Sequence, residues 1–205
     1  MLPLSRIVFA SGNPGKIREV GDIFADQDIS IVPQREFAIE SPEETGTTFA
    51  DNALLKARHA AARSGLPAMA DDSGIVVDAL GGGPGVRSAR YAGEQATDDQ
   101  NVDKLLQELA DVPDAQRGGG FHCAAVLVFP ERDVAPLIVE AVWRGKILRE
   151  RAGEGGFGYD PVFLDLSSGK TGAQMTREEK NCVSHRGKAF RELKNLLLTM
   201  RHENR

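Results

Sequence analysis

Residues 121–129, F-H-C-A-A-V-L-V-F, are the feature that most limits how this chain can fold. The segment is apolar on both faces of an extended strand, which predicts a central strand covered on each side. Residues 137–143 follow after a seven-residue connection and can pair back on it antiparallel. The chain has 205 residues, 41% hydrophobic and 27% charged, values ordinary for a globular protein with one core or two small lobes.

Short apolar runs and amphipathic segments alternate along the rest of the chain. Residues 7–10 predict a buried first strand, and the next segment carries apolar residues at the spacing of one helix face. Further strands are expected at residues 29–32, 68–70 and 75–80, and helices from Thr47 or Thr48 to Ser64, from capping boxes at Thr97 and Thr176, and after Ser184. This alternation, with at least one hairpin, predicts a mixed α/β fold in which helices cover a mixed sheet.

Composition argues against several classes of protein. The formal net charge of −5 is opposite to that of a broad nucleic-acid-binding surface. The apolar run 7–10 is too short for a signal sequence or a membrane span. Two distant cysteines form neither a disulfide framework nor a zinc motif, and the four histidines are scattered, so we expect a cytoplasmic protein without a transition-metal cluster.

The first predicted strand is followed by a loop, S-G-N-P-G-K at residues 11–16, which leads into the first predicted helix. Glycines let backbone N–H groups approach an anion, and Lys16 adds a positive charge at a helix N-terminus. The spacing is not that of a Walker A loop. The sequence therefore leaves two interpretations open, a phosphate-binding loop and a plain turn followed by a solvated lysine.

Two acidic pairs, Glu43–Glu44 and Asp71–Asp72, are candidates for metal binding. The second pair lies at an apparent break between strand segments, and adjacent side chains of an extended chain point to opposite faces, so the two aspartates should not face one site. Carboxylates among apolar strand residues need a nearby cation, and Mg²⁺ prefers such oxygen ligands. The alternative is a solvated D-D-S-G turn.

Three further segments carry polar or aromatic candidates. Asn52 and Lys56 are four residues apart, which is typical of a polar outer helix face. The glycine-rich loop 155–161 suits a cover over a flat ligand on which Phe157 stacks, or a hinge whose aromatic residues lie in the core. Lys180 and the stretch 184–187 place possible cations beside helix ends, where a plain surface helix is the alternative.

Together, five segments resemble the inosine triphosphate pyrophosphatase family, its bacterial branch most closely. They are S-G-N-P-G-K, E-E-T-G-T-T-F-A-D-N-A-L-L-K-A, A-D-D-S-G-I-V-V-D-A-L-G-G-G-P-G-V-R-S-A-R-Y, G-G-F-G-Y-D-P and T-R-E-E-K-N-C-V-S-H-R-G-K-A. They occur in the family's order and cover nearly the whole chain. The resemblance implies an elongated mixed sheet with two α/β lobes and a central substrate cleft, one functional domain over residues 1–205, a homodimer and Mg²⁺ dependence.

The resemblance also implies roles for particular residues. Asp72 is the expected catalytic base, and Glu44 with Asp72 the expected metal ligands, with Glu43 and Asp71 left open. The expected substrate contacts are Ser11, Gly12, Asn13, Pro14, Gly15, Lys16, Lys56, Ser73, Phe157, Gly158, Tyr159, Asp160, Lys180, His185 and Arg186. Ser11 stands where the family often has threonine, which keeps the hydroxyl, and the triple glycine 118–120 is expected only to loosen a strand's start.

The activity implied is hydrolysis of deaminated purine nucleoside triphosphates (ITP, dITP, XTP) to a monophosphate and pyrophosphate, which cleanses the nucleotide pool. Arg186 is expected to donate to the C6 oxygen of the base, because arginine has only donors. Guanine also has this oxygen, so the sequence does not say how GTP is excluded. Two rivals remain, a pyrophosphatase for pyrimidine or methylated nucleotides and a non-catalytic nucleotide sensor.

Overall fold

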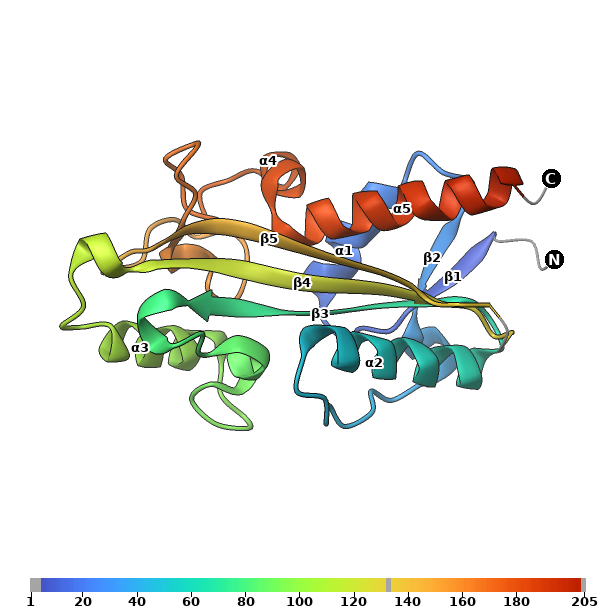
Figure 1. Ribbon diagram of the computed structural model, residues 1–205, viewed down its shortest axis with the longest axis horizontal. Helices are drawn as coiled ribbons and strands as arrows, with labels where there is room; N and C mark the ends of the chain where they lie inside the picture. The colour runs from blue at the N-terminus through green and yellow to red at the C-terminus, as the bar shows by residue number, and fades with distance from the viewer. Residues whose placement is uncertain (1–4, 132–133, 204–205) are drawn as a thin grey trace. The chain divides into compact units, whose positions relative to one another are not determined.

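The computed structural model describes residues 5–131 and 134–203 (Figure 1). Six strands form one mixed sheet in the order β2-β1-β3-β4-β5-β6. β1 pairs in parallel with both β2 and β3, and β5 pairs antiparallel with β6. The strands are β1 Arg6–Phe9, β2 Ser30–Pro33, β3 Ala68–Val77, β4 Gly118–Val128, β5 Leu137–Ile147 and β6 Phe163–Leu164. The helices are α1 Pro14–Phe24, α2 Phe49–Ser64, α3 Asp98–Glu108, α4 Arg177–Val183 and α5 His185–Glu203.

The chain divides into two compact units. Unit 1 comprises Met1–Asp72, Cys123–Ala141 and Arg186–Arg205, and unit 2 comprises Ser73–His122 and Val142–His185. β3, β4 and β5 each contribute residues to both units.

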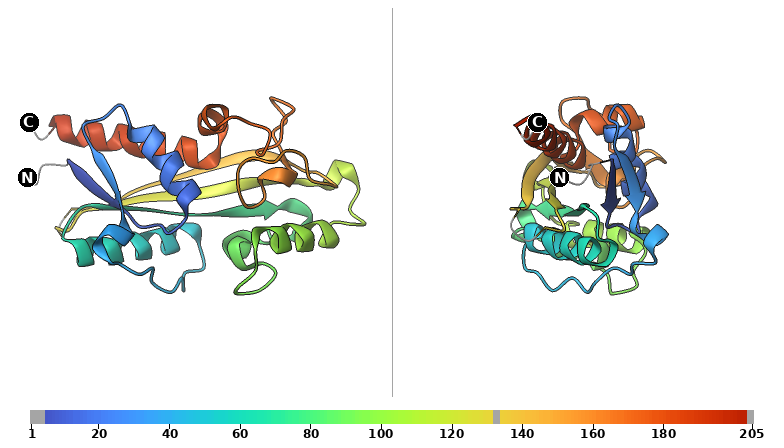
Figure 2. Two further views of the ribbon diagram at one scale, coloured as in Figure 1. Left: turned by 180° about the vertical axis from the view of Figure 1, so that it is seen from behind. Right: turned by 90° about the vertical axis from the view of Figure 1, so that its right-hand side faces the viewer.

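In unit 1, helices cover both faces of the sheet. α1 and α5 lie on one face and α2 on the other, as the two views of Figure 2 show. Phe9, Val20 and Phe190 belong to the core under α1 and α5, where the rings of Phe9 and Phe190 meet edge to face at 5.7 Å. Small residues such as Ala53, Ala57 and Ala60 line the core under α2. Alanines let α2 approach the sheet closely, which brings its polar side chains near the strands.

Unit 2 has its own core around the other ends of β3, β4 and β5. Val102 and Leu105 of α3 pack there with Phe121, Trp143 and Phe163. Trp143 is almost fully buried, and its indole N–H donates to Asp165 Oδ1 at 2.9 Å.

Local sequence signals predicted the helix boundaries well. Thr48 caps α2, and Gly65 ends it with a positive φ of 66°. Thr97 and Thr176 each form the predicted capping box, and Ser184 directly precedes α5. The Thr48, Thr97 and Thr176 side chains each accept from a backbone N–H that has no partner within the helix.

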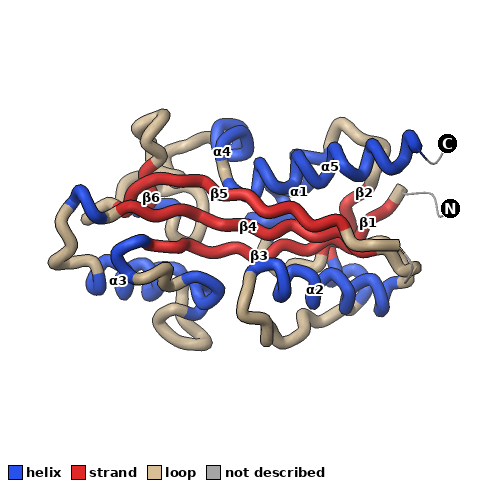
Figure 3. Tube along the Cα trace, viewed as in Figure 1, coloured by secondary structure: helices blue, strands red, loops and turns tan. Residues whose placement is uncertain are grey.

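Two predictions about strands were wrong. The predicted break at residues 71–74 does not exist, because β3 runs unbroken from Ala68 to Val77 (Figure 3). The strand then ends at Val77, and Asp78–Leu80 forms a 3-10 helix in place of the predicted strand end.

The triple glycine was also misjudged. Gly118–Val128 is one strand, so the glycines are part of it. A Cβ on Gly119 would lie 2.8 Å from Val76 O, closer than real Cβ contacts allow. This glycine therefore permits close strand packing rather than loosening the strand's start.

Candidate functional site

Unit 1 contains a charged cluster, which we define as Lys16, Glu19, Glu44, Lys56, Asp71, Asp72 and Arg186. Lys16 and Glu44 are half-buried, and the other five side chains are buried. These residues come from α1, α2, β3, α5 and the loop before α2. Asp71 and Asp72, consecutive in β3, contact different partners, as strand alternation predicted. The cluster therefore has an Asp71 side and an Asp72 side.

On the Asp71 side, charges are balanced. Asp71 Oδ2 lies 2.9 Å from Lys16 Nζ and 3.1 Å from Arg186 Nη2. Arg186 Nη1 donates to Glu19 Oε2 at 2.7 Å. Burial alone would raise the pKa of Asp71, but the charges of Lys16 and Arg186 outweigh it and hold this pKa below the usual 3.8. Two carboxylates thus face two cations.

On the Asp72 side, two carboxylates share one cation. Lys56 Nζ donates to Glu44 Oε1 at 2.6 Å and to Asp72 Oδ1 at 3.1 Å. The pKa of Asp72 is raised, first by burial and then by the negative charge of Glu44, against the lowering effect of Lys56. The pKa of Lys56 is raised because Asp72, Asp71 and Glu44 outweigh the effect of its burial. This side therefore carries one excess negative charge.

The excess charge fits a bound divalent cation. No group of three or more His, Cys, Asp or Glu side chains is arranged to hold a metal within the described residues. Mg²⁺ does not require such a cage, because it commonly binds through one or two carboxylates and fills its other positions with water and phosphate oxygens. Glu44 and Asp72 provide such a pair, whereas the charge of Asp71 is already balanced and Glu43 is exposed.

Burial of Asn52 and Lys56 corrects another prediction. The two residues lie on one face of α2, but they are 0% and 8% exposed and do not form a polar outer face. The polar atoms at the ends of both side chains contact Asp72. The alternative of a solvated D-D-S-G turn is wrong for the same reason, since Asp71 and Asp72 are both buried.

The loop at residues 11–16 is organised by its own side chains. Asn13 caps α1, and its Oδ1 accepts from the N–H groups of Gly15 at 2.8 Å and Lys16 at 3.2 Å. Ser11 Oγ accepts from Asn13 N–H. Three of the backbone N–H groups expected to face a phosphate thus have a partner within the loop. The Lys16 side chain remains partly exposed, at 17%, beside Asp71.

A second group of predicted residues gathers in unit 2. Lys180 Nζ donates to Asp160 Oδ2 at 2.6 Å and lies 4.5 Å from the centre of the half-buried Phe157 ring. Asp160 also accepts from Phe157 N–H at 2.9 Å. Gly156 has a φ of 75°, and a Cβ there would collide with the Asp160 carboxylate. One ion pair therefore fixes both the loop and its aromatic ring.

Tyr159, Ser73 and His185 occupy different surroundings in unit 2. Tyr159 lies in the core of unit 2 and its hydroxyl donates to Ser88 O at 2.8 Å, which matches the core-packing alternative for this ring. Ser73 is half-buried within β3, and Gly158 N–H donates to Asp98. The His185 ring is buried and stacks on Phe121 at 4.8 Å with an 8° interplanar angle.

The alternative in which Arg186 is a solvated helix residue is wrong. The side chain is 2% exposed, and both Asp71 and Glu19 accept from its guanidinium. Sequence reasoning missed Glu19 altogether. Its position in α1 beside apolar Val20 and Ile23 was a usable signal, because a carboxylate next to a buried helix face needs a cation.

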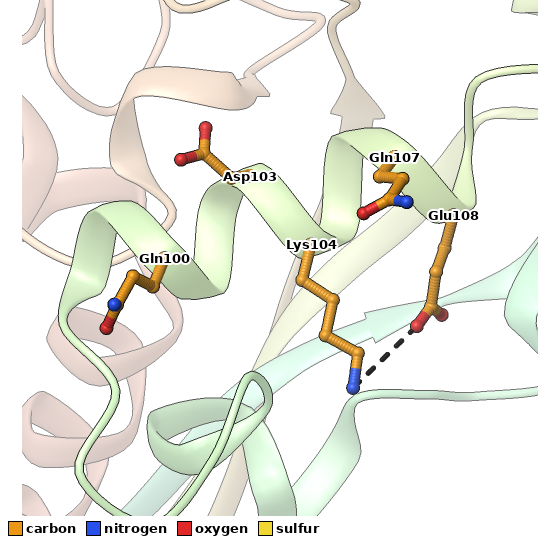
Figure 4. Close-up of a pocket in the computed structure, with 5 residues that line it drawn as sticks. All are labelled: Gln100, Asp103, Lys104, Gln107 and Glu108. Carbon is orange, nitrogen blue, oxygen red and sulfur yellow. Dashed lines mark ion pairs between the residues drawn. The ribbon is translucent and has the colours of Figure 1, made fainter.

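The pocket drawn in Figure 4 is lined by other residues. They are Gln100, Asp103, Lys104, Gln107 and Glu108, all from α3, with Lys104 Nζ 3.9 Å from Glu108 Oε1. A surface formed by one helix offers no convergent groups for chemistry. We therefore take two groups as candidates for function, the charged cluster in unit 1 and the Phe157–Asp160–Lys180 group in unit 2.

The fold and these groups define a mixed α/β protein with buried ionisable side chains whose pKa values are shifted, which is typical of functional sites. The Ham1 family model matches residues 7–196, and the chain belongs to the Ham1 family. The resemblance seen in the sequence is thereby confirmed.

The similarity to known proteins extends over almost the whole length of both chains. The dITP/XTP pyrophosphatase of Pectobacterium atrosepticum is 54% identical over 190 residues, which cover 93% of this chain and 96% of the relative. The enzyme of the same name from Escherichia coli O157:H7 gives the same values. The solved structure of a HAM1 protein from Coxiella burnetii has a TM-score of 0.87 and 47% identity, covering 95% of this chain and 98% of its own. The predicted fold class is confirmed by this match.

Proposed function

We propose that this protein hydrolyses deaminated purine nucleoside triphosphates, dITP and XTP together with ITP, to the nucleoside monophosphate and pyrophosphate. The observation that carries the proposal is the Asp72 side of the charged cluster. There, the buried carboxylate of Asp72 and the half-buried carboxylate of Glu44 share one lysine, in a chain 54% identical to enzymes named dITP/XTP pyrophosphatase.

Lys16 binds the triphosphate. Its ammonium is already held by Asp71 at 2.9 Å, so it is oriented before the substrate arrives. A phosphate at the start of α1 also gains from the helix dipole. Because Asn13 caps the first amides, the contribution of Lys16 is its charge, which offsets the negative charge that grows as the phosphoanhydride breaks.

Glu44 and Asp72 are the residues that would hold Mg²⁺. When bound there, the ion supplies positive charge that draws electron density from the phosphate oxygens and keeps both carboxylates ionised. Lys56 stays between the two carboxylates and limits their repulsion.

Asp72 positions the attacking water. Its Oδ1 accepts from Lys56 and its Oδ2 from Asn52, so the carboxylate plane is fixed from both ends. A carboxylate offers about four lone-pair positions, which leaves room for a water molecule as well. Asp72 acts mainly by position, as a weak base whose orientation matters more than its proton affinity.

In unit 2, the aromatic ring of Phe157 stacks on the purine base. The ammonium of Lys180 lies over the ring, 4.5 Å from its centre. Stacking of the purine on the Phe157 ring orients the base, and Lys180 adds charge at the same place. The predicted contacts from Ser73, Gly158, His185 and Arg186 belong to this same proposal.

We also propose that residues 1–205 act as one functional domain in a cytoplasmic homodimer. The support is the family resemblance and a sequence with two scattered cysteines. Among the described residues, no helix is long and apolar enough to cross a membrane.

A substrate panel tests the proposal. With Mg²⁺ present, kcat/KM is measured for dITP, XTP, dATP, dGTP, dCTP and dUTP. We expect dITP and XTP to exceed every other substrate by at least ~10²-fold, the selectivity that hydrogen bonding to a base can supply. A preference for a pyrimidine nucleotide would indicate a pyrophosphatase for pyrimidine nucleotides instead. No turnover of any substrate would favour a non-catalytic nucleotide sensor.

A further inference from the structure

Asn52 is the one polar residue of the described α2 helix with no exposed surface, at 0%. Its side-chain amide joins two separate parts of unit 1. Oδ1 accepts from the backbone N–H of Gly46 at 2.8 Å, and Nδ2 donates to Asp72 Oδ2 at 3.1 Å. One planar group therefore fixes the distance between the loop before α2 and the carboxylate in β3.

The orientation of this amide follows from its neighbours. A backbone N–H can only donate, so the end facing Gly46 must be the oxygen. The nitrogen then faces Asp72, which accepts when ionised. Aspartate at position 52 would keep the first contact and lose the second, and leucine of similar size would lose both.

Asn52 acts in parallel with Lys56, one helical turn later. Lys56 joins Glu44 to Asp72, and Asn52 joins Gly46, two residues after Glu44, to the same carboxylate. Lys56 adds a charge to this arrangement, whereas Asn52 adds none. The contribution of Asn52 is therefore geometric.

Gly46 is fitted to this contact. A Cβ at this position would lie 2.6 Å from Asn52 Oδ1 and 2.8 Å from Asp51 Cβ, both below the range of real Cβ contacts. Any larger residue would push the loop away from α2. The loop that carries Glu44 is thus held close to α2 by a glycine and an asparagine together.

We propose that Asn52 is a positioning residue that holds the Asp72 carboxylate and the Glu44 loop in one fixed arrangement for the reaction. The inference rests on the proposed function, because it assigns to Asn52 a part in the same chemistry. Groups that orient the ligands of a metal commonly change metal affinity or activity by about 10–100-fold when removed.

The chain offers a matched control in α3. Asn101 stands four residues after the capping Thr97, as Asn52 stands four residues after the capping Thr48. Asn101 Oδ1 accepts from Ala92 N–H at 2.8 Å, and its Nδ2 donates to Ala89 O at 3.1 Å. It is 2% exposed. The two asparagines differ in that the donor of Asn52 contacts the Asp72 carboxylate and that of Asn101 a backbone carbonyl.

The experiment compares Asn52→Asp, Asn52→Leu and Asn101→Leu with the wild type. Steady-state kinetics with dITP give kcat and KM, and urea unfolding gives stability. Amide hydrogen exchange reports on Gly46 N–H. Calorimetry measures Mg²⁺ binding to enzyme saturated with α,β-methylene-dITP, which cannot be cleaved between the α- and β-phosphates.

We expect Asn52→Leu and Asn101→Leu to lower stability comparably, but only Asn52→Leu to lower kcat by about 10–100-fold and to weaken Mg²⁺ binding. Asn52→Asp should lower kcat as strongly while the Gly46 amide stays protected, because its acceptor remains. If Asn52→Leu does not fold, the kcat of Asn52→Asp and the protection of its Gly46 amide test the inference without it.

The inference is overturned if the Asn52 variants keep kcat and Mg²⁺ affinity within twofold of Asn101→Leu. Failure of the proposed function would look different, because then the wild type itself would not hydrolyse dITP.

Discussion

Arg186→Met removes the cation that joins Glu19 and Asp71. The guanidinium is 2% exposed, with contacts of 2.7 Å to Glu19 and 3.1 Å to Asp71. After the change, both buried carboxylates have lost the guanidinium that they share. Removing one partner of a buried ion pair costs about 3–5 kcal/mol. Native domains are stable by about 5–15 kcal/mol, so the loss is a large fraction of the total.

The same variant should weaken the effect of acid on stability. In the wild type, Lys16 and Arg186 overcome burial and hold the pKa of Asp71 below 3.8, so this residue contributes stability that is lost as pH falls through that low pKa. Without Arg186, one of the charges that lower the pKa of Asp71 is lost while burial and Lys16 remain, so this pKa rises toward its unfolded value. The stability that ionised Asp71 contributes at neutral pH is then smaller, and less of it is lost as pH falls.

Urea unfolding at pH 7 and at about pH 3, below the unfolded pKa of aspartate, measures both effects. The double variant Glu19→Gln/Arg186→Met is the control. It should recover most of the lost stability, because one buried negative charge is removed together with the positive charge of Arg186. A loss below ~1 kcal/mol at pH 7, the value of an exposed pair, would refute the buried-cluster reasoning.

Three further substitutions test individual roles, and a fourth measurement tests base selection. Asp72→Asn should lower kcat by at least ~10²-fold, the scale of positioned acid–base groups, while the exposed Asp78→Asn leaves kcat unchanged; wild-type turnover would remove Asp72 from the mechanism. Lys16→Ala should weaken dITP binding more than binding of the monophosphate, measured by calorimetry, and equal losses would show that Lys16 does not contact the phosphate chain. Phe157→Ala should raise KM for dITP by the equivalent of ~1–3 kcal/mol, and an unchanged KM would leave this ring with packing alone. In Arg186→Ala, the ITP/ATP ratio of kcat/KM should fall more than tenfold, whereas a parallel loss for both substrates would limit Arg186 to its ion pairs.

Local signals in the sequence were sufficient to predict most of the helices and strands. Thr48, Thr97 and Thr176 start helices through hydrogen bonds within four residues, so the sequence around each contains the whole cause. The strand at residues 121–129 was predictable because its apolar pattern needs no knowledge of its partners.

Predictions about buried charge failed where the partner is distant in sequence. D-D-S-G favours a turn when considered alone, yet it continues β3 because Lys56 and Arg186 supply cations from α2 and α5. Arg186 and Asp71 are separated by 115 positions. The polar face of α2 was misjudged for the same reason, since its hydrogen-bond partner Asp72 lies 20 positions beyond Asn52.

The family resemblance supplied what local patterns could not. It selected Glu44 and Asp72 from four candidate acids, and the charge balance of the cluster independently favours the same two. Their role in holding a metal remains a prediction.

The most direct test of the central claim is the identity of the products. Purified protein is incubated with dITP and Mg²⁺, and deoxyinosine monophosphate, pyrophosphate and inorganic phosphate are quantified separately. The account predicts one pyrophosphate for each deoxyinosine monophosphate and no inorganic phosphate above background. Release of inorganic phosphate with deoxyinosine diphosphate would contradict it, because cleavage would then lie between the β- and γ-phosphates.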